Sequence, residues 1–234
     1  MDQAMSKEGK ARMKERLNAL HALWKAQNTS TTGTETVASH PVNLEDYGIY
    51  ARYADATFAN LEKRGIPTQI KSQYQKIKEY AEHLDENVKQ GKGLILSGPV
   101  GNMKTTLAMA ILRQYIDMHQ RGFAISMPSF LTMIDYNYKF NLRDNRIDRI
   151  KRAKLLVLDD LGAEYDHQWV QTQVDAIITE RYNRKLATII TTNLSRDEIA
   201  DRYQARIYDR LKCVNYLIGF EAKSLRQPLN WANH

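Results

Sequence analysis

Short apolar runs alternate with amphipathic segments along most of the chain, and they predict strands that alternate with helices. The apolar, β-branched runs expected to form strands lie at 93–97, 122–127, 153–160, 186–191 and 214–218. Apolar residues on one face predict a helix from Pro67 to about Gln90, and further helices are expected at 107–116, near 168–184 and near 202–212. The capping box Ser195-Arg-Asp-Glu198 predicts the start of a short helix between the last two. Strands that alternate with helices imply an α/β fold with a parallel sheet.

The first part of the chain has a different pattern. Met13, Leu17, Leu20 and Trp24 are spaced by four, three and four residues among many lysines and arginines, which predicts a basic amphipathic helix. Such a helix could dock on a partner protein, lie along nucleic acid, pack on the main domain of its own chain or pair with a second copy of itself. A polar stretch too poor in apolar residues to pack follows it. We therefore expect a partner-docking helix at 1–27, a flexible linker at 28–40 and the main domain at 41–234.

Composition narrows the class of protein. The chain has 234 residues and a net charge of +7, which favours a polyanionic partner such as nucleic acid. Its single cysteine, Cys213, permits no internal disulfide, and no apolar run approaches the roughly 20 residues that span a bilayer. These features predict a soluble, cytoplasmic protein without a membrane partner.

The segment 93–108 predicts a strand, a glycine-containing loop and the start of a helix. Gly98, Lys104 and Thr105 fit the pattern G-x-x-x-x-G-K-[ST], in which backbone N–H groups and a lysine bind phosphates and a hydroxyl binds Mg²⁺. This pattern indicates a P-loop that binds ATP with Mg²⁺. The residues expected to bind the nucleotide are Gly98, Pro99, Val100, Gly101, Asn102, Met103, Lys104, Thr105 and Thr106.

One residue departs from the pattern, because Met103 stands where the second glycine is expected. If the loop requires a left-handed backbone there, a methionine costs roughly 1–2 kcal/mol. The substitution therefore predicts weaker nucleotide binding or slower turnover.

Polar side chains follow two of the predicted strands. Asp159 and Asp160 end the strand at 153–160, where a first carboxylate would hold Mg²⁺ and a second would polarise the attacking water. Asn193 follows the strand at 186–191 and would point toward the γ-phosphate or that water. Parallel sheets place ligands at the carboxyl ends of their strands, so these groups are expected to meet near Thr105.

With these motifs in order, residues 47–226 resemble the AAA+ helicase loaders of the DnaC type and the related IstB transposition helpers. The motifs that carry the resemblance are Tyr53-Ala-Asp-Ala-Thr-Phe58, Gly98-Pro-Val-Gly101 with Lys104-Thr105, Leu155-Leu-Val-Leu-Asp-Asp-Leu-Gly162, Ile190-Thr-Thr-Asn193, Arg206-Ile-Tyr-Asp-Arg210 and Ser224-Leu-Arg226.

The resemblance implies a three-layer AAA+ ATPase domain at 41–234 with a five-stranded parallel sheet in the order 5-1-4-3-2 and no C-terminal helical lid. It makes Asn193 the sensor 1 residue, Arg210 an arginine finger that acts on a neighbouring copy, and Arg226 the sensor 2 arginine. With Asp160, these are the residues expected to carry out hydrolysis.

Three functions fit these observations. The first is an ATP-dependent loader that binds a replicative DNA helicase and single-stranded DNA when replication starts. The second is an IstB-like transposition helper that binds duplex DNA and a transposase. The third is a nucleotide-binding adaptor with little turnover.

The segment 130–152 is a candidate for binding single-stranded DNA. Aromatic residues stack on bases and cations follow phosphates, and this segment mixes both kinds. The residues concerned are Phe130, Tyr136, Tyr138, Lys139, Phe140, Arg143, Arg146, Arg149, Lys151 and Arg152. An ordinary helix with an apolar core face and a basic solvent face would give the same pattern.

Overall fold

The computed structural model describes residues 43–141, 145–164 and 167–226. The chain divides into two units, Met1–Val42 and Asn43–His234, and all of the described residues belong to the second. Three predictions concern residues outside this description: the basic helix, the linker and the role of Arg143. The expected absence of a lid also depends on residues outside it, those after Arg226.

Five parallel strands form a single sheet in the order β2-β3-β4-β1-β5, which confirms the expected order when the sheet is followed from its other edge. The strands are β1 (Gly93–Ser97), β2 (Gly122–Ser126), β3 (Leu155–Leu161), β4 (Ala187–Thr192) and β5 (Asn215–Gly219). The central strands β1 and β4 are buried along their whole length. Continuous apolar runs are typical of parallel strands covered on both faces.

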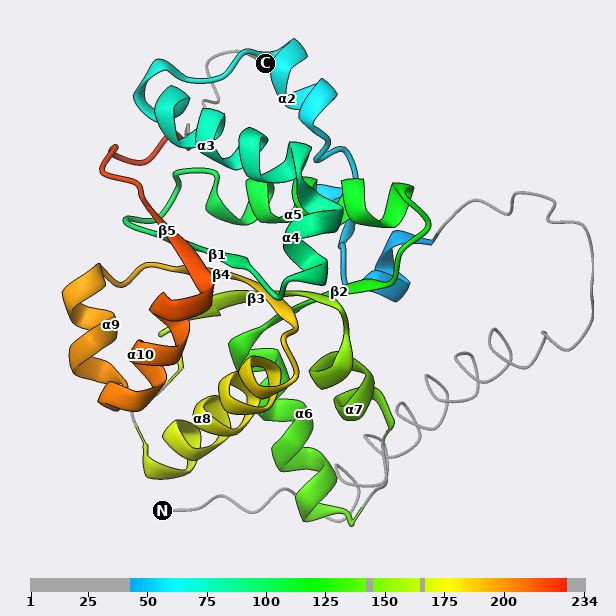
Figure 1. Ribbon diagram of the computed structural model, residues 1–234, viewed down its shortest axis with the longest axis vertical. Coiled ribbons are helices and arrows are strands. Elements are labelled where there is room, and N and C mark those ends of the chain that lie inside the picture. The colour runs from blue at the N-terminus through cyan, green and yellow to red at the C-terminus, as the bar shows by residue number, and fades with distance from the viewer. Residues whose placement is uncertain (1–42, 142–144, 165–166, 227–234) are drawn as a thin grey trace, which may run out of the picture. The chain divides into compact units, whose positions relative to one another are not determined.

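Helices cover both faces of the sheet (Figure 1). On one face lie α2 (Phe58–Arg64), α3 (Lys71–Glu82), α4 (Leu84–Lys89) and α5 (Lys104–Asp117), and on the other lie α6 (Met127–Lys139), α7 (Asn145–Arg152), α8 (Gln168–Asn183), α9 (Arg196–Arg202) and α10 (Ala205–Val214). Three short 3₁₀ helices, η1 (Leu44–Tyr47), η2 (Ala51–Tyr53) and η3 (Thr68–Ile70), complete the described elements. The architecture is a three-layer α/β/α sandwich, as expected.

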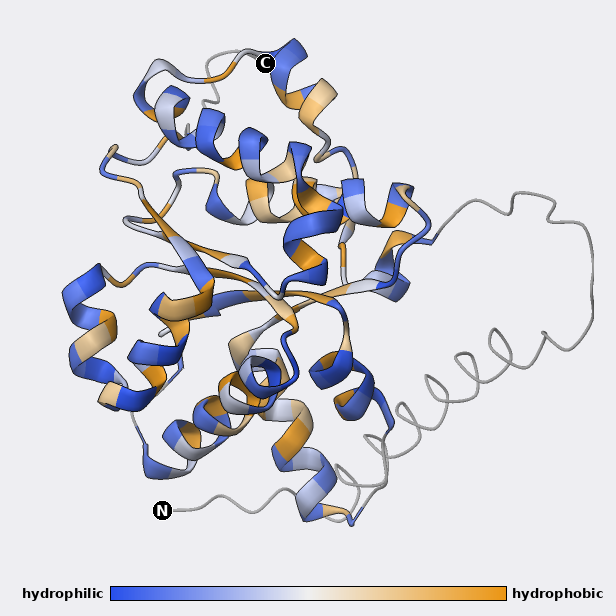
Figure 2. Ribbon diagram, viewed as in Figure 1, coloured by the Kyte–Doolittle hydropathy of each residue, from blue (hydrophilic) through white to orange (hydrophobic). Residues whose placement is uncertain are grey.

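Alternate residues of each strand enter different cores. Leu94 and Leu96 pack with α3, α4 and α5, whereas Ile95 between them packs with α6, α8 and α10. Successive side chains of a strand point to opposite faces, so one apolar run supplies both cores. The apolar stripes of the helices face the sheet and their polar stripes face outward (Figure 2). Among the described residues no helix has the length and apolar character needed to cross a bilayer.

The helix predicted from Pro67 to about Gln90 is broken, because α3 ends at Glu82 and α4 begins at Leu84. Two side-chain amides satisfy carbonyls at the end of α3: Asn87 Nδ2 donates to Tyr80 O (3.1 Å) and Gln114 Nε2 donates to Ala81 O (2.7 Å). The last carbonyls of a helix have no partner within it, so these amides stabilise the break. Periodicity could not reveal it, because the apolar spacing continues through both helices.

A buried arginine joins α8 to the start of β4 and to the connection between α7 and β3. Arg181 is 1% exposed and donates to Thr188 Oγ1 (2.8 Å), Ala187 O (2.6 Å) and Ala153 O (2.9 Å). Burial lowers the pKa of Arg181 to about 9. Hydrogen bonds to carbonyl oxygens compensate part of the cost of burying its charge.

Candidate functional site

The predicted phosphate loop lies between β1 and α5 and has the backbone of an anion-binding nest. Its φ angle is positive at Gly98 (133°), Gly101 (85°) and Met103 (63°). Successive N–H groups in such turns point toward a common centre at the amino-terminal end of the helix. A Cβ at Gly98 would lie 2.0 Å from Phe220 O, so glycine is required there for space as well as conformation.

Met103 adopts the left-handed conformation on which the sequence argument depended, with φ 63° and ψ 10°. It is half-buried and its side chain packs against the core that contains α5. A non-glycine residue in this conformation carries roughly 1–2 kcal/mol of strain. The loop is therefore built in the expected shape despite the missing glycine.

Met103→Gly should tighten ATP binding or raise turnover, by up to about tenfold, because relief of about 1.4 kcal/mol corresponds to one factor of ten. Titration calorimetry and a steady-state ATPase assay measure the two quantities. Met118→Gly is the matched control, since Met118 has an ordinary φ of −80° at the other end of α5. Equal affinity and rate in Met103→Gly and the unsubstituted protein would contradict the strain argument.

The Lys104 side chain folds back over the loop. Its ammonium donates to Gly98 O (2.6 Å), Pro99 O (2.7 Å) and Asn193 Oδ1 (3.1 Å). Burial lowers the pKa of Lys104, and the charges of Asp160 and Asp159 oppose that shift. The structure thus brings the predicted loop lysine and the predicted Asn193 into direct contact.

Asp159 and Thr105 also meet as predicted. Thr105 Oγ1 donates to Asp159 Oδ1 (2.9 Å), and Thr191 Oγ1 donates to the same oxygen (2.5 Å). Burial raises the pKa of Asp159, while both hydroxyls lower it. A hydroxyl and a carboxylate are the oxygen ligands that Mg²⁺ prefers, so the donor set fits this cation. Thr191 belongs to the Ile190-Thr-Thr-Asn193 motif, but its role was missed, because nothing in that motif shows that its hydroxyl reaches the neighbouring strand.

Asp160 begins a tight turn at the end of β3. It has φ 56°, and its N–H donates to Thr191 Oγ1 (3.0 Å). Left-handed non-glycine residues cluster at functional sites, where the surrounding structure enforces them. Thr191 therefore fixes both carboxylate residues, one through the side chain and the other through the backbone.

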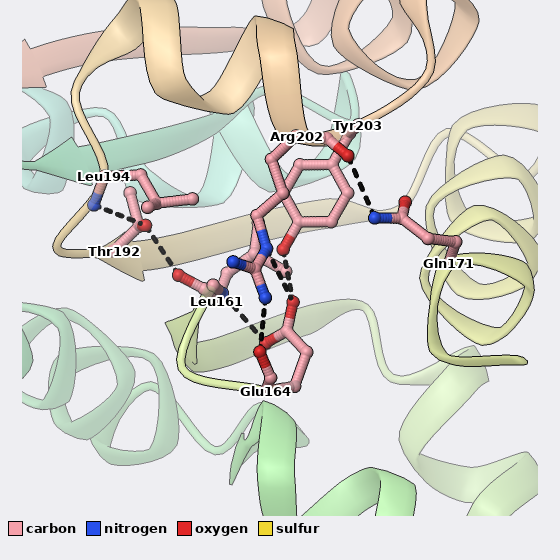
Figure 3. A network of polar contacts seen from close by, with 8 residues as sticks. Leu161, Glu164, Gln171, Thr192, Leu194, Arg202 and Tyr203 are labelled. Carbon is pink, nitrogen blue, oxygen red and sulfur yellow. Dashed lines mark hydrogen bonds and ion pairs between the residues drawn. The ribbon is translucent and has the colours of Figure 1, made fainter. Parts of the chain in front are cut away.

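A buried polar network holds the turn after Asp160 (Figure 3). Glu164 accepts hydrogen bonds from Gly162 N (2.9 Å) and from the Tyr203 hydroxyl, and its carboxylate pairs with Arg202 (3.8 Å). Thr192 Oγ1 donates to Leu161 O (2.6 Å) in the same network. These contacts tie β3 to the segment that leads from β4 into α10, and no sequence motif predicted them.

A cavity of about 430 Å³ opens beside the loop. It is lined by predicted site residues and by others from distant parts of the chain: Arg52, Tyr53, Pro67, Val100, Gly101, Asn102, Met103, Lys104, Thr105, Thr106, Asp160, Asn193, Leu225 and Arg226. Arg52 and Pro67 were missed, because nothing in their local sequence shows that they lie against the loop.

Arg206 and Arg210 lie elsewhere, on the face of α10 that packs against α8. Arg210 Nη1 donates to Thr179 Oγ1 (2.8 Å) and lies 3.5 Å from Asp175 Oδ1, and Arg206 pairs with the other oxygen of Asp175. Neither arginine is among the described residues that line the cavity. In this chain, both side chains are instead held by Asp175 of α8.

The fold and site define a P-loop nucleotide-binding protein of the AAA+ class. The family of IstB-like ATP-binding proteins matches residues 59–226, and the chain belongs to that family.

Relatives with a named role are replicative helicase loaders. The chain is 24% identical to DnaI of Bacillus subtilis over 168 residues, 66% of this chain and 54% of that protein. It is 27% identical to DnaC of Buchnera aphidicola over 188 residues, 77% of this chain and 73% of that protein. The chain thus spans about half the length of DnaI.

A solved structure of the DnaC helicase loader superposes with a TM-score of 0.66 and 26% identity, covering 73% of this chain and 99% of the other. These likenesses confirm the resemblance and the fold inferred from the motifs.

Proposed function

We propose that the chain is an ATP-dependent helicase loader that binds a replicative DNA helicase and single-stranded DNA during the initiation of DNA replication. The observation that carries the proposal is the assembled P-loop site, in which Lys104 contacts Asn193 and Thr105 contacts Asp159, in a chain whose named relatives are replicative helicase loaders. A cytoplasmic location is part of the same proposal, because the proposed partner acts there.

In this proposal the loop residues 98–106 bind the phosphates of ATP, and Thr105 and Asp159 hold Mg²⁺. The bound Mg²⁺ supplies positive charge at the phosphates during hydrolysis. Asp160 lines the cavity as the carboxylate that orients the attacking water, and Asn193 and Arg226 line it as polar contacts to the nucleotide. The protein is then an ATPase, and hydrolysis of the bound ATP changes its affinity for its partners.

We further propose that residues 1–27 form the helicase-docking domain, joined by the linker 28–40 to the ATPase domain. Leu17→Asp should abolish co-purification with the host replicative helicase while ATPase activity stays near normal, because the charge falls on the apolar stripe. Asn18→Asp is the matched control, since it adds the same charge off the stripe. Loss of both properties in Leu17→Asp would mean that the helix packs on the ATPase domain instead.

Single-stranded DNA is the proposed second partner, and the exposure of the candidate aromatic residues supports one part of the segment 130–152 as its binding surface. Phe130 is fully buried and cannot stack on a base, whereas Tyr138 is 87% exposed and Phe140 47% exposed at the end of α6. The next described helix, α7, carries four basic residues within eight: Arg146, Arg149, Lys151 and Arg152. The proposed surface is therefore the end of α6 with α7.

Tyr138→Ala should weaken binding of a single-stranded oligonucleotide about tenfold at fixed salt, because base stacking on an aromatic ring contributes about 1–3 kcal/mol. Fluorescence anisotropy measures the affinity. Tyr216→Ala is the control, since Tyr216 is an exposed tyrosine on β5. Equal weakening by both substitutions would place the DNA elsewhere.

The transposition helper remains the second proposal, because the matching family is named after IstB. A pull-down distinguishes the two proposals: the tagged protein is presented with the host helicase and with a transposase encoded beside it, and the retained partner is identified. Retention of the transposase alone would replace the loader proposal. Retention of the helicase without measurable ATP turnover would favour the adaptor function.

A further inference from the structure

The segment 220–226, which comes after β5, runs along the phosphate loop and is bonded to it. Phe220 N donates to Ser97 O (2.7 Å), and Leu225 N donates to Gly101 O (3.0 Å). A Cβ at Gly101 would lie 2.1 Å from Ser224 Oγ, so the Ser224 side chain packs directly against the loop where glycine leaves room for it. The segment ends at Arg226, which lines the cavity beside the loop.

Asn102 connects these two backbones through its side chain. Asn102 is 1% exposed, and its Nδ2 donates to Ala222 O (2.6 Å) in the segment and to Pro99 O (3.2 Å) in the loop. Both acceptors are carbonyls, so the amide must present its NH₂ group to them. Its Oδ1 is buried and has no partner among the described residues. Both donors of the amide are thus used to join loop and segment.

Arg226 is close enough to the loop for its charge to matter there. Its backbone N–H donates to Ser224 Oγ (3.3 Å), and it directly follows Leu225, whose N–H donates to the loop at Gly101 O. Its positive charge adds to the burial that lowers the pKa of Lys104. Lys104 and Arg226 thus line one cavity together with Arg52, an arrangement of cations suited to a polyanion.

We propose that Asn102 is a positioning residue for Arg226: its side-chain amide ties the phosphate loop to segment 220–226 and so fixes the guanidinium over the cavity. The inference rests on the proposed binding of ATP at this loop. Asn102 contributes its backbone to the loop like its neighbours, but its side chain serves the distant C-terminal segment. A change in the loop at residue 102 is thereby transmitted to Arg226.

A double-mutant cycle tests this role with affinity for Mg·ATP as the readout. Arg226→Ala should weaken binding about tenfold, the effect of losing one charge-assisted contact of about 1.4 kcal/mol. Asn102→Leu, which keeps the shape but removes the donors, should weaken binding similarly. The double variant should be no weaker than either single one, because both remove the same contact. Two results would overturn the inference. One is a double variant that binds about one hundredfold more weakly, because the two single effects then multiply; the other is an Asn102→Leu affinity equal to that of the unsubstituted protein.

Asn215→Leu is the matched control. The Asn215 amide also donates to a backbone carbonyl, Leu211 O (2.7 Å), and also leaves a buried Oδ1 without a partner among the described residues, but it lies at the opposite end of β5. This variant should keep the ATP affinity and the tenfold effect of Arg226→Ala. An equal loss of affinity in Asn215→Leu would mean that general destabilisation, not positioning, explains the result.

Hydrogen exchange in the unsubstituted full-length chain gives an answer even if Asn102→Leu fails to fold. If loop and segment are coupled, Mg·ATP should slow exchange of the Leu225 amide by about fivefold or more, since coupling between sites is reciprocal. ATP binding with unchanged exchange at Leu225 would overturn this inference and leave the nucleotide proposal standing. Absence of ATP binding in the unsubstituted protein would overturn both.

Discussion

Lys104→Ala will reduce the affinity for Mg·ATP at least about one hundredfold. Removing one partner of a buried, hydrogen-bonded charge pair costs about 3 kcal/mol or more. The Lys104 ammonium is the only charged group in the loop 98–106, and it contacts Gly98 O and Asn193 Oδ1. Alanine leaves the phosphates without their cation. Titration calorimetry with Mg²⁺ present gives the affinity.

Lys223→Ala is the control for overall charge, because Lys223 is exposed on the segment beside the loop and its loss changes the net charge equally. Thermal unfolding of both variants shows that the fold is retained. An affinity of Lys104→Ala within threefold of the unsubstituted protein would contradict the P-loop assignment.

Arg210→Ala will abolish ATP turnover without removing ATP binding, and mixing it with inactive Lys104→Ala chains will restore part of the activity. An arginine supplied by a neighbour stabilises the charge of phosphoryl transfer, an effect of about 10³–10⁵ in rate. Lys104→Ala chains contribute an intact Arg210, and Arg210→Ala chains contribute an intact ATP site. Steady-state ATPase rates of the two variants, alone and mixed, measure the effect.

The hydrogen bonds of Arg210 within its own chain use only part of its guanidinium. Only its Nη1 has a hydrogen-bond partner among the described residues, so Nε and Nη2 remain available to a phosphate of a neighbouring copy. Arg184→Ala is the control, because Arg184 is an arginine beside α8 paired with Glu180. If cross-linking shows mixed assemblies yet activity stays at zero, Arg210 does not act between copies.

The fold and the centre of the site could be predicted because each depends on local patterns. The run Leu155–Leu158 predicts a buried strand wherever it occurs, and Gly98 and Lys104 indicate a phosphate loop by spacing alone. The same patterns place the strands to within two residues of their observed bounds and put Asp159 near the end of β3.

The supporting residues could not be predicted, because their roles depend on partners far away in the sequence. Glu164 interacts with Tyr203, which is 39 residues distant, and Asn102 with Ala222, which is 120 residues distant. Arg181 reads as a surface arginine in its sequence context, and only the packed structure shows it buried among carbonyls. A single sequence carries no record of such pairings.

Arg206 and Arg210 share the single carboxylate of Asp175, so within this group of three side chains two positive charges face one negative. An excess cation at a surface lowers the energy of an approaching anion, and salt at physiological strength screens this effect beyond about 8 Å. If Arg210 acts on a neighbouring copy, as predicted above, assembly through α10 should therefore be sensitive to salt and dilution. ATP consumption would then depend on local crowding of the protein and remain low until a binding surface gathers several copies.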